Sequence, residues 1–461
     1  YIRYTQKRYD EALKGFLPLQ DDVKYKALVP YYIAEIYAVK KNYDKAQIVA
    51  QNYLSAYPQN EHAAEMYRIL GDAYYHKAVA SFRNYLEKEN TPRRDALYML
   101  GLSYFQTGVF SKAAETLGEV TTESDALTQN AYLHMGLAYL HLAEKNKARM
   151  AFEQAAASNA NLKIKEQAAY NYALCIHETS YSAFGESVTV FEKFLNEFPN
   201  SEYAEMVSSY LVEVYMNTRS YEAALKSIDR IAHPGKRILE AKQRILFQLG
   251  TQAFANTQFE QAIGYFDRSL GLGQYNRQTK ADALYWRGEA YYRLNRMEEA
   301  KRNFTDYLQL TQQTHNEMYA LAHYNLGYIA FHQKDYTQAQ NWFRKYISLE
   351  KGENKTALAD AYNRIGDCYL DVRNFDEAKH YYSQAEANTP SGDYSFYQLA
   401  LVSGLQKDYS GKITLLNRLA GKYPASPYAI SALYEKGRSY VLMDNNQQAI
   451  ASFKELLAKY P

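Results

Sequence analysis

The sequence is short of cysteine, of net charge and of long apolar runs. Its two cysteines, Cys175 and Cys368, lie in no CxxC or other metal-ligand spacing. Lysine and arginine number 53 against 51 aspartates and glutamates, so no overall field attracts the chain to nucleic acid or anionic lipid. No apolar run approaches the roughly 18 residues that a membrane-spanning helix needs. We therefore expect protein or peptide partners, no nucleic acid and no transmembrane segment.

Motifs for catalysis and for metal or cofactor binding are also missing. His134 and His141 are seven residues apart, but the sequence has no HExxH motif, no third metal ligand beside them and no glycine-rich phosphate loop. We interpret these histidines as structural, and both cysteines as compact core residues rather than nucleophiles. The sequence predicts a protein that is not an enzyme and has no catalytic, metal-binding or cofactor-binding residues.

Tyrosine is the abundant residue, with 48 copies, and it recurs in a repeated phrase centred on glycine. A second phrase, aromatic-x-x-Ala-x-x-x-aromatic, follows the first, as in FEQAIGYF (259–266) and FDEAKHYY (375–382). In seven units the alanine lies twelve residues after the glycine. The first phrase occurs as LGDAYY (70–75), LGLSYF (100–105), MGLAYL (135–140), LGTQAF (249–254), RGEAYY (287–292), LGYIAF (326–331), IGDCYL (365–370) and KGRSYV (436–441).

Both phrases have the apolar spacing of amphipathic helices, at i, i+3, i+4 and i+7. Glycine inside a helix costs about 1 kcal/mol relative to alanine, so its recurrence indicates that two helices approach closely there. Short polar segments, such as KKN before Tyr43 and QKD before Tyr336, are interpreted as turns. The sequence therefore predicts an all-α chain of helical hairpins, repeated every 34 to 39 residues.

These phrases resemble the tetratricopeptide repeat, whose pattern is LGxxYY, then YxxA, then F, then P. The resemblance covers essentially the whole chain and implies one continuous right-handed α-α superhelix over residues 1–461, with about twelve helix-hairpin units and a leading half unit. It implies that first helices line a concave face, that second helices cover the outside, and that there is no catalytic activity. Because the sequence begins in mid-repeat at Tyr1, we expect a fragment of a longer chain.

A narrower resemblance concerns the linkers FPNSEYAEMV (198–207) and YPASPYAISA (423–432). They look like the linkers of envelope-associated tetratricopeptide proteins of Gram-negative bacteria, including the outer-membrane-protein assembly and cell-division coordinator families. This resemblance implies a periplasmic or outer-membrane-associated location in a bacterium. The cytoplasm is the alternative.

Binding residues are expected on the concave side of the first helices, at positions three before, one after and four after the glycine. Aromatic side chains exposed there offer apolar area with little rotamer entropy to lose, which suits a peptide or helix partner. The alternative is that the rings pack on one another inside a narrow superhelix. The expected partner-binding residues are Tyr98, Phe105, Phe247, Phe254, Tyr285, Glu289, Tyr292, Tyr324, Tyr328, Phe331, Asn363 and Asp367.

Two other sets of residues recur at helical spacing. Acidic residues on first helices favour a basic partner segment, or form only a solvated surface; they are Asp282, Glu289, Asp360, Asp367 and Asp371. The tyrosines three residues after the glycine are expected in the core; they are Tyr74, Tyr104, Tyr139, Tyr291 and Tyr369.

We interpret the chain as a non-enzymatic scaffold that binds partner proteins or peptides along a concave aromatic groove, in a bacterial cell-envelope assembly. The alternative is the recognition arm of a larger sensory, regulatory or catalytic protein whose active domain lies outside these residues. The family's clamp for a C-terminal carboxylate uses an asparagine directly after the glycine, and no unit has one. The acidic residues argue against an RNA-reading protein, which needs a basic groove.

The phrase LGDAYYHKAVASF (70–82) is five residues shorter than its counterparts, since Ala78 follows Gly71 by only seven positions. The turn and the aromatic residue that opens the second helix are absent. A true deletion would fuse the two helices, because a hairpin cannot close without its turn. We therefore expect a break in the chain between His76 and Lys77, at a loop that the numbering skips.

Overall fold

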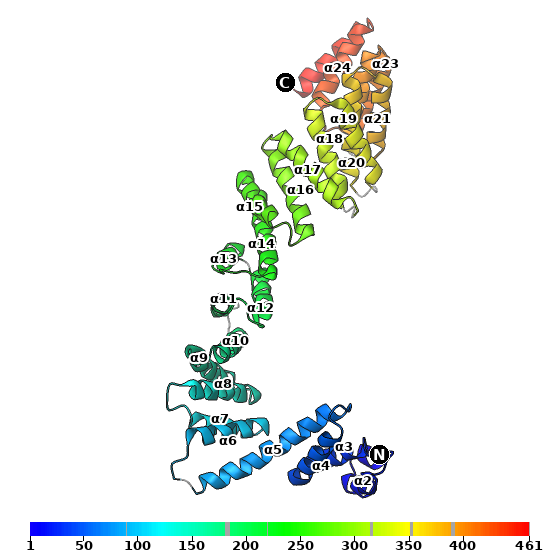
Figure 1. Ribbon diagram of the computed structural model, residues 1–461. Helices are drawn as coiled ribbons and strands as arrows, with labels where there is room; N and C mark the ends of the chain where they lie inside the picture. The colour runs from blue at the N-terminus through cyan, green and yellow to red at the C-terminus, as the bar shows by residue number, and fades with distance from the viewer. Residues whose placement is uncertain are drawn as a thin grey trace. The chain divides into compact units, whose positions relative to one another are not determined.

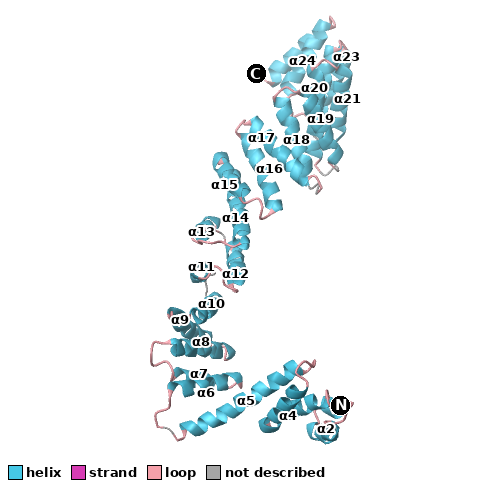
Figure 2. Cartoon of the chain, in the orientation of Figure 1, coloured by secondary structure: helices cyan, strands magenta, loops and turns pink. Residues whose placement is uncertain are grey.

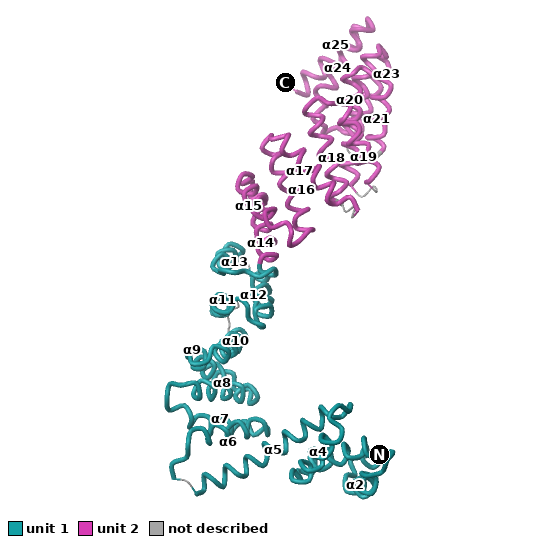
Figure 3. Tube along the Cα trace, in the orientation of Figure 1, with its two compact units in different colours: residues 1–238 teal, residues 239–461 magenta. Residues whose placement is uncertain are grey.

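The computed structural model describes residues 1–88, 90–179, 185–218, 220–313, 317–350, 354–388 and 392–460. These residues form α-helices joined by short loops, with one 3-10 turn and no strand (Figure 2). The expected all-α architecture is thereby confirmed. Contacts divide the chain into two units, Tyr1–Ile238 and Leu239–Pro461 (Figure 3). Each is described by itself below, and one continuous superhelix through both stays a prediction.

Consecutive helices of unit 1 pair as hairpins, except at α5 (Figure 1). The helices are α1 (Ile2–Thr5), α2 (Tyr9–Phe16), α3 (Val29–Val39), α4 (Tyr43–Ala56), α5 (Ala63–Leu86), α6 (Arg94–Gln106), α7 (Phe110–Gly118), α8 (Ala126–His141), α9 (Lys145–Ala157), α10 (Leu162–Thr179), α11 (Glu186–Glu197), α12 (Ala204–Asn217) and α13 (Tyr221–Ile228), with the 3-10 turn η1 (Leu17–Leu19) after α2.

Unit 2 contains hairpins of the same kind, and α14 includes the boundary between the units. The helices are α14 (Lys236–Ala255), α15 (Phe259–Gly271), α16 (Arg277–Arg293), α17 (Met297–Thr311), α18 (Glu317–His332), α19 (Tyr336–Leu349), α20 (Lys355–Asp371), α21 (Phe375–Asn388), α22 (Asp393–Leu405), α23 (Tyr409–Lys422), α24 (Ala429–Leu442) and α25 (Asn446–Lys459).

The two helices of a repeat meet where the glycine of the first faces a large side chain of the second. A Cβ atom added to Gly327 would lie 2.7 Å from Cε1 of Phe343, and one added to Gly136 would lie 2.5 Å from Cε1 of Phe152. Interiors are close-packed, so a side chain at these positions displaces its neighbour. The facing residue is four positions after the alanine of the second phrase, and the same close approach recurs at Gly101, Gly250, Gly288, Gly366 and Gly437.

A residue in the left-handed region closes the turn of these hairpins. It lies seven positions after the small residue of the first helix, and Gly108 occupies this position with φ +77°. Glycine adopts this conformation at no steric cost, whereas other residues are strained in it. The other repeats nevertheless hold φ between 54° and 65° at Lys41, Ala143, Thr257, Asn295, Lys334, Arg373, Lys407 and Asp444.

The unit around Gly71 has no such turn. α5 runs without interruption from Ala63 to Leu86, through His76 and Lys77 (Figure 1). The two helices of this unit are fused in this structure, and the skipped loop expected between these two residues stays a prediction. The physical reason is that Ala78, seven positions after Gly71, lies among residues that all continue a helix, so nothing stops the backbone there.

The tyrosines expected in the core are less buried than their spacing predicts. Tyr104 is buried, Tyr139, Tyr291 and Tyr369 are half-buried, and Tyr74 is 48% exposed. Cations at the start of the second helix cover two of these rings: Lys147 lies 5.4 Å from the centre of Tyr139, and Arg296, the N-cap of α17, lies 4.6 Å from that of Tyr291. The expectation of core burial was therefore wrong for most of this set, because these rings lie at the edge of the hairpin, where a cation packs over them.

Replacing Gly327 by alanine is expected to destabilise unit 2 by about 1 kcal/mol or more, since the new methyl group must displace Phe343. Gly264→Ala on α15 is the matched control, because a Cβ there meets nothing within 4 Å. The control gains up to about 1 kcal/mol from helix propensity alone. Urea unfolding measures both changes, and hydrogen exchange shows whether the loss is confined to neighbouring repeats, as expected for a repeat array. Equal effects of the two substitutions contradict the close-approach argument.

Candidate protein-binding face

First helices of successive repeats contact one another in both units. In unit 2, α16 contacts α18 and α18 contacts α20, and in unit 1, α6 contacts α8 and α8 contacts α10. Among the described residues, no two second helices make an equally extensive contact. In a curved stack of hairpins, the helices on the inner side lie closer together than those on the outer side. The first helices therefore line the inner side of each unit. The side of α14, α16, α18, α20 and α22 that lies there is called the inner face of unit 2.

Two tyrosines of α18 bind one carboxylate of α20 on this face. The hydroxyl of Tyr324 donates to Asp360 Oδ2 at 2.8 Å, and the hydroxyl of Tyr328 donates to the same oxygen. The two rings lie 5.1 Å apart, and both pack edge-on against Phe343 of α19. Burial raises the pKa of both phenols, so they remain donors at neutral pH. The pair thus fixes Asp360 in place from the preceding repeat.

Arg364 of α20 lies between a carboxylate and two rings. Its Nη1 is 2.6 Å from Asp367 Oδ2, and its guanidinium lies 5.9 Å from the ring centre of Phe331 and 5.0 Å from that of Tyr394. Asp367 Oδ1 accepts hydrogen bonds from Tyr382 at 2.7 Å and Tyr394 at 2.8 Å. Burial raises the pKa of the Asp367 carboxyl even though Arg364 and the two hydroxyls favour its charged form. These contacts link α18, α20, α21 and α22.

A third polar contact joins α16 to α18. Asn325 Nδ2 donates to Glu289 Oε1 and also, at 3.3 Å, to the hydroxyl of Tyr285. Asp282 lies seven residues before Glu289 and so on the same side of α16. Burial raises the pKa of both carboxyl groups. The neighbouring cations and donors therefore do not offset the cost of burying these two charges.

The other predicted residues of unit 2 pack against neighbouring rings or helices. The ring of Phe254 lies 5.2 Å from Trp286, and that of Tyr292 lies 6.1 Å from His332. Asn363 is buried and accepts a hydrogen bond from the Ser395 hydroxyl at 2.9 Å. Phe247 and Phe331 are half-buried, at ring distances of 5.9 Å from Phe266 and Tyr336 respectively.

In unit 1 the predicted residues meet both histidines that the sequence singled out. Phe105 lies 5.9 Å from His134 and 5.7 Å from His141, and Tyr98 lies 6.2 Å from His134. His141 stacks on Phe110 at 4.1 Å. Burial lowers the pKa of His134, whose Nδ1 lies 2.9 Å from a backbone carbonyl of its own helix. These histidines complete an aromatic cluster between α6, α7 and α8.

None of the twelve predicted residues is fully exposed. Tyr285 and Asn363 are buried and the other ten are half-buried, so the rings pack on one another, as the alternative expectation had it. Whether they bind a partner stays a prediction. Sequence reasoning missed Asn325, Arg364 and Tyr394, which lie two or six residues before the small residue of their helix and contact the preceding repeat. A polar side chain recurring two residues before the glycine was the available signal.

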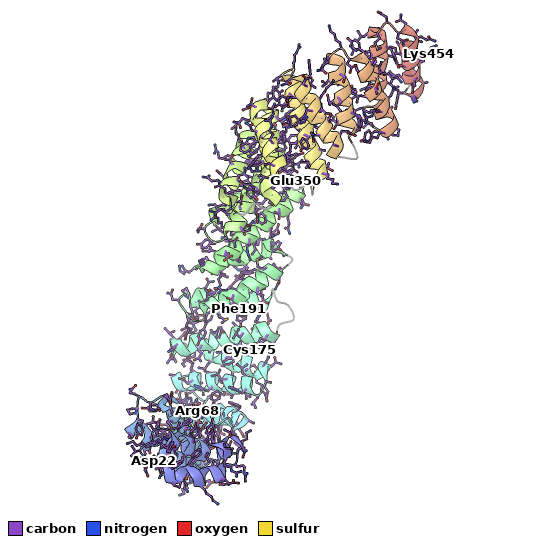
Figure 4. All side chains as sticks on the ribbon, turned by 90° about the vertical axis from the view of Figure 1, so that its right-hand side faces the viewer. Asp22, Arg68, Cys175, Phe191, Glu350 and Lys454 are labelled. Atoms are coloured by element: carbon purple, nitrogen blue, oxygen red, sulfur yellow. The ribbon has the colours of Figure 1, made fainter. Side chains whose placement is uncertain are left out.

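Reactive chemistry has little support in the described part of the chain. No group of three histidine, cysteine or acidic side chains could hold a metal ion there. Cys175, which Figure 4 labels on α10, and Cys368 are both buried. Burial raises the pKa of the Cys175 thiol to about 11 and that of Cys368 to about 12, so neither is a thiolate at neutral pH. Across the described ranges no helix combines the length and apolarity needed to cross a membrane.

Three solved structures of helical repeat proteins are similar to this chain. YrrB, described as a TPR protein with an unusual peptide-binding site, is 18% identical with a TM-score of 0.34, covering 41% of this chain and 90% of its own. PilW, described as a type IV pilus biogenesis factor, is 18% identical with a TM-score of 0.37, covering 48% and 94%. The APC/C hetero-tetramer Cut9-Hcn1 is 12% identical with a TM-score of 0.32, covering 100% and 92%.

Sequence comparison gives one curated relative and several family matches. The uncharacterized protein ycf37 of Guillardia theta is 38% identical over 68 residues, which is 15% of this chain and only 38% of that relative's length. Models of the tetratricopeptide repeat match residues 95–124, 129–162, 247–309, 317–391, 363–427 and 431–461. Together these ranges cover more than half of the chain, which therefore belongs to the tetratricopeptide repeat family.

Proposed function

We propose that this protein is a non-catalytic scaffold that holds a segment of another protein against the inner face of unit 2. The observation that carries the proposal is the row of tyrosine, phenylalanine and carboxylate side chains that successive first helices present there, from Phe247 on α14 to Asp367 on α20. Hydrogen bonds such as Tyr324 to Asp360 hold these side chains in place before a partner arrives. A pre-organised surface loses little side-chain entropy on binding.

The preferred partner segment carries lysine or arginine. Burial disfavours the charged forms of Asp282 and Glu289 on α16 and raises the pKa of both carboxyl groups. A cation placed beside them offsets that cost, and the half-buried ring of Tyr292 on the same side of the helix favours a cation as well. A basic peptide is thus matched to this surface in charge and in aromatic contact.

The linkers 198–207 and 423–432 support placing this scaffold in a bacterial cell envelope, as part of a protein assembly. In each, a proline follows an aromatic residue, and the range continues through a short segment into the first turn of a first helix, α12 or α24. Their likeness to envelope-associated tetratricopeptide proteins is what supports the location. Fractionation of the native cells tests it directly, and recovery of the protein with the cytoplasm contradicts it.

Neutralising Asp282 and Glu289 together, as Asp282→Asn and Glu289→Gln, is expected to weaken the binding of lysine- and arginine-containing peptides about fivefold. Two partly buried ion pairs contribute roughly 0.5 kcal/mol each, or about 1 kcal/mol together. Fluorescence anisotropy with peptides of equal length and graded net charge measures the change.

The matched control for this binding experiment is Glu260→Gln with Asp306→Asn, which removes the same charge from exposed positions on α15 and α17. Its affinity for the basic peptides is expected to stay near that of the native chain. Equal weakening in both variants means that only the overall charge matters and rejects the inner-face proposal. So does binding that does not depend on peptide charge.

Glu289→Gln is expected to stabilise the protein at neutral pH. Because burial raises the pKa of Glu289 in the folded state, the folded chain binds the proton more tightly, and stability falls as pH rises through the interval between the ordinary and the raised pKa. Glutamine can still accept from Asn325 and carries no charge. Denaturant unfolding at pH 7 should therefore favour the variant, with the difference vanishing below about pH 4, the ordinary range for glutamate. A variant less stable at pH 7 shows that the carboxylate is net favourable.

A further inference from the structure

The helix α5 contains both halves of a repeat, but the two halves do not face each other. Its N-terminal half carries the first phrase with Gly71, and its C-terminal half carries the second phrase with Ala78 and Phe82. Met66 and Ile69 pack on α4, whereas Val79 and Phe82 pack against the cluster of Leu100 on α6. Each half therefore makes its contacts with the adjacent repeat and lacks the contact inside its own repeat.

Gly71 is consequently the one glycine of the eight first phrases with nothing opposite it. A Cβ atom added to Gly71 meets no atom within 4 Å, whereas its seven counterparts face a Leu, Phe or Tyr side chain. In those units the facing residue lies four positions after the alanine, and here that residue is Phe82. Phe82 is eleven residues along the same helix, a rise of about 16 Å. Within one chain the two cannot meet.

The surface around Gly71 has the marks of an uncovered interface. Tyr67 is 58% exposed and Tyr74 is 48% exposed, and both share a helix face with Gly71, four residues before it and three after it. Three cavities, of about 580, 520 and 370 Å³, border the C-terminal half of the same helix, and none of the three is lined by Gly71, Tyr67 or Tyr74. The largest is lined by His76, Lys77 and Ala80, at the point where the turn is missing.

We propose that a second copy of this chain covers α5, so that each copy supplies the second helix of the other's incomplete repeat. In an antiparallel pair with its two-fold axis between His76 and Lys77, Gly71 of one copy lies opposite Phe82 of the other, and the reverse contact forms at the same time. An interface between identical chains must be self-complementary in this way. A hairpin whose connection is too short to close within a chain is also the situation that favours exchange of an element between chains.

The register set by Gly71 and Phe82 also suits the rest of the helix. Residues whose numbers sum to 153 lie opposite each other, which places exposed Tyr74 against Val79 and exposed Tyr67 against Leu86. The Gly71–Phe82 contact alone defined the register, and it did not require these further pairings. The occupant of this face is therefore inferred to be a second α5.

Light scattering after gel filtration of the full chain is expected to give twice the 53.2 kDa of one chain. Gly71→Leu should reduce this to the monomer mass, because the new side chain occupies the position of Phe82 of the partner copy. It should leave the helix content undiminished, since the site is open within one chain. Gly264→Leu, at another open site on α15, is the matched control and should remain a dimer. A native chain that is monomeric at every concentration overturns the proposal.

Single cysteine variants give a test that does not depend on mass. Gly71→Cys and Phe82→Cys are expected to form a disulfide when the two proteins are mixed, and neither should do so alone. Within one chain the two positions are about 16 Å apart along the helix, far beyond the roughly 7 Å that a disulfide can bridge. The native cysteines are buried and do not compete. Absence of the mixed disulfide overturns the antiparallel register.

Restoring the turn supplies the converse experiment. Inserting the five residues TGVFS, copied from Thr107–Ser111, between His76 and Lys77 gives this unit the length of its neighbour and a glycine at the left-handed position. The hairpin can then close within one chain, Phe82 can reach Gly71, and the mass should fall to that of a monomer. A dimer that persists after the insertion shows that another surface holds it together and rejects the role of α5.

Discussion

The contact between a large side chain and the bare backbone of a glycine sets the geometry of these repeats. Where Phe343 occupies the space that a Cβ of Gly327 would fill, the two helices of the hairpin lie as close as their backbones permit. That closeness leaves so short a connection that Lys334 is held at φ 60°. Glycine inside a helix and a strained residue in the turn are each unfavourable alone, and the close-packed ring offsets both.

Between repeats, buried side chains of two different types hydrogen-bond to the connecting loop. Gln243, on the first helix α14, is buried and binds the loop ahead of α16 through Asn276, donating to its carbonyl and accepting from its N–H at 2.9 Å each. In another repeat Tyr53, from the second helix α4, reaches the loop ahead of α5 and donates to Asn60 Oδ1 at 2.6 Å. Either way a buried side chain satisfies backbone or side-chain polar groups of the connecting loop, which would otherwise be costly to bury. Different residue types can serve at this place in the stack, because the requirement is only that a buried side chain fill the space beside the connecting loop and hydrogen-bond to it.

The sequence was enough to predict the helices and their pairing, because these follow from local periodicity and from the cost of glycine. The side on which the first helices lie was implied by the resemblance to the tetratricopeptide repeat. The sequence was not enough to predict exposure on that side. Spacing gives the direction of Tyr324 and Tyr328 from their own helix, but their burial depends on Asp360 and Arg364 of the next one, and side-chain reach across an interface has no local signature. At α5 the sequence showed that a turn was missing and that a true deletion would fuse the two helices, but it did not decide between a deletion and a skipped loop.

An array of repeats is stabilised by two kinds of contact, one inside each hairpin and one between neighbours. At α5 the second kind is present on both sides, through Met66 toward α4 and through Val79 toward α6, while the first kind is missing. The covalent helix keeps the two sides connected, but it cannot replace the burial that a ring on Gly71 supplies in the other units. The missing contact is one between two helices, and the second of these helices does not have to belong to the same chain. A second chain can therefore supply the contact without any change in the remaining repeats. A loop shortened by five residues thereby converts a contact within a repeat into a contact between molecules.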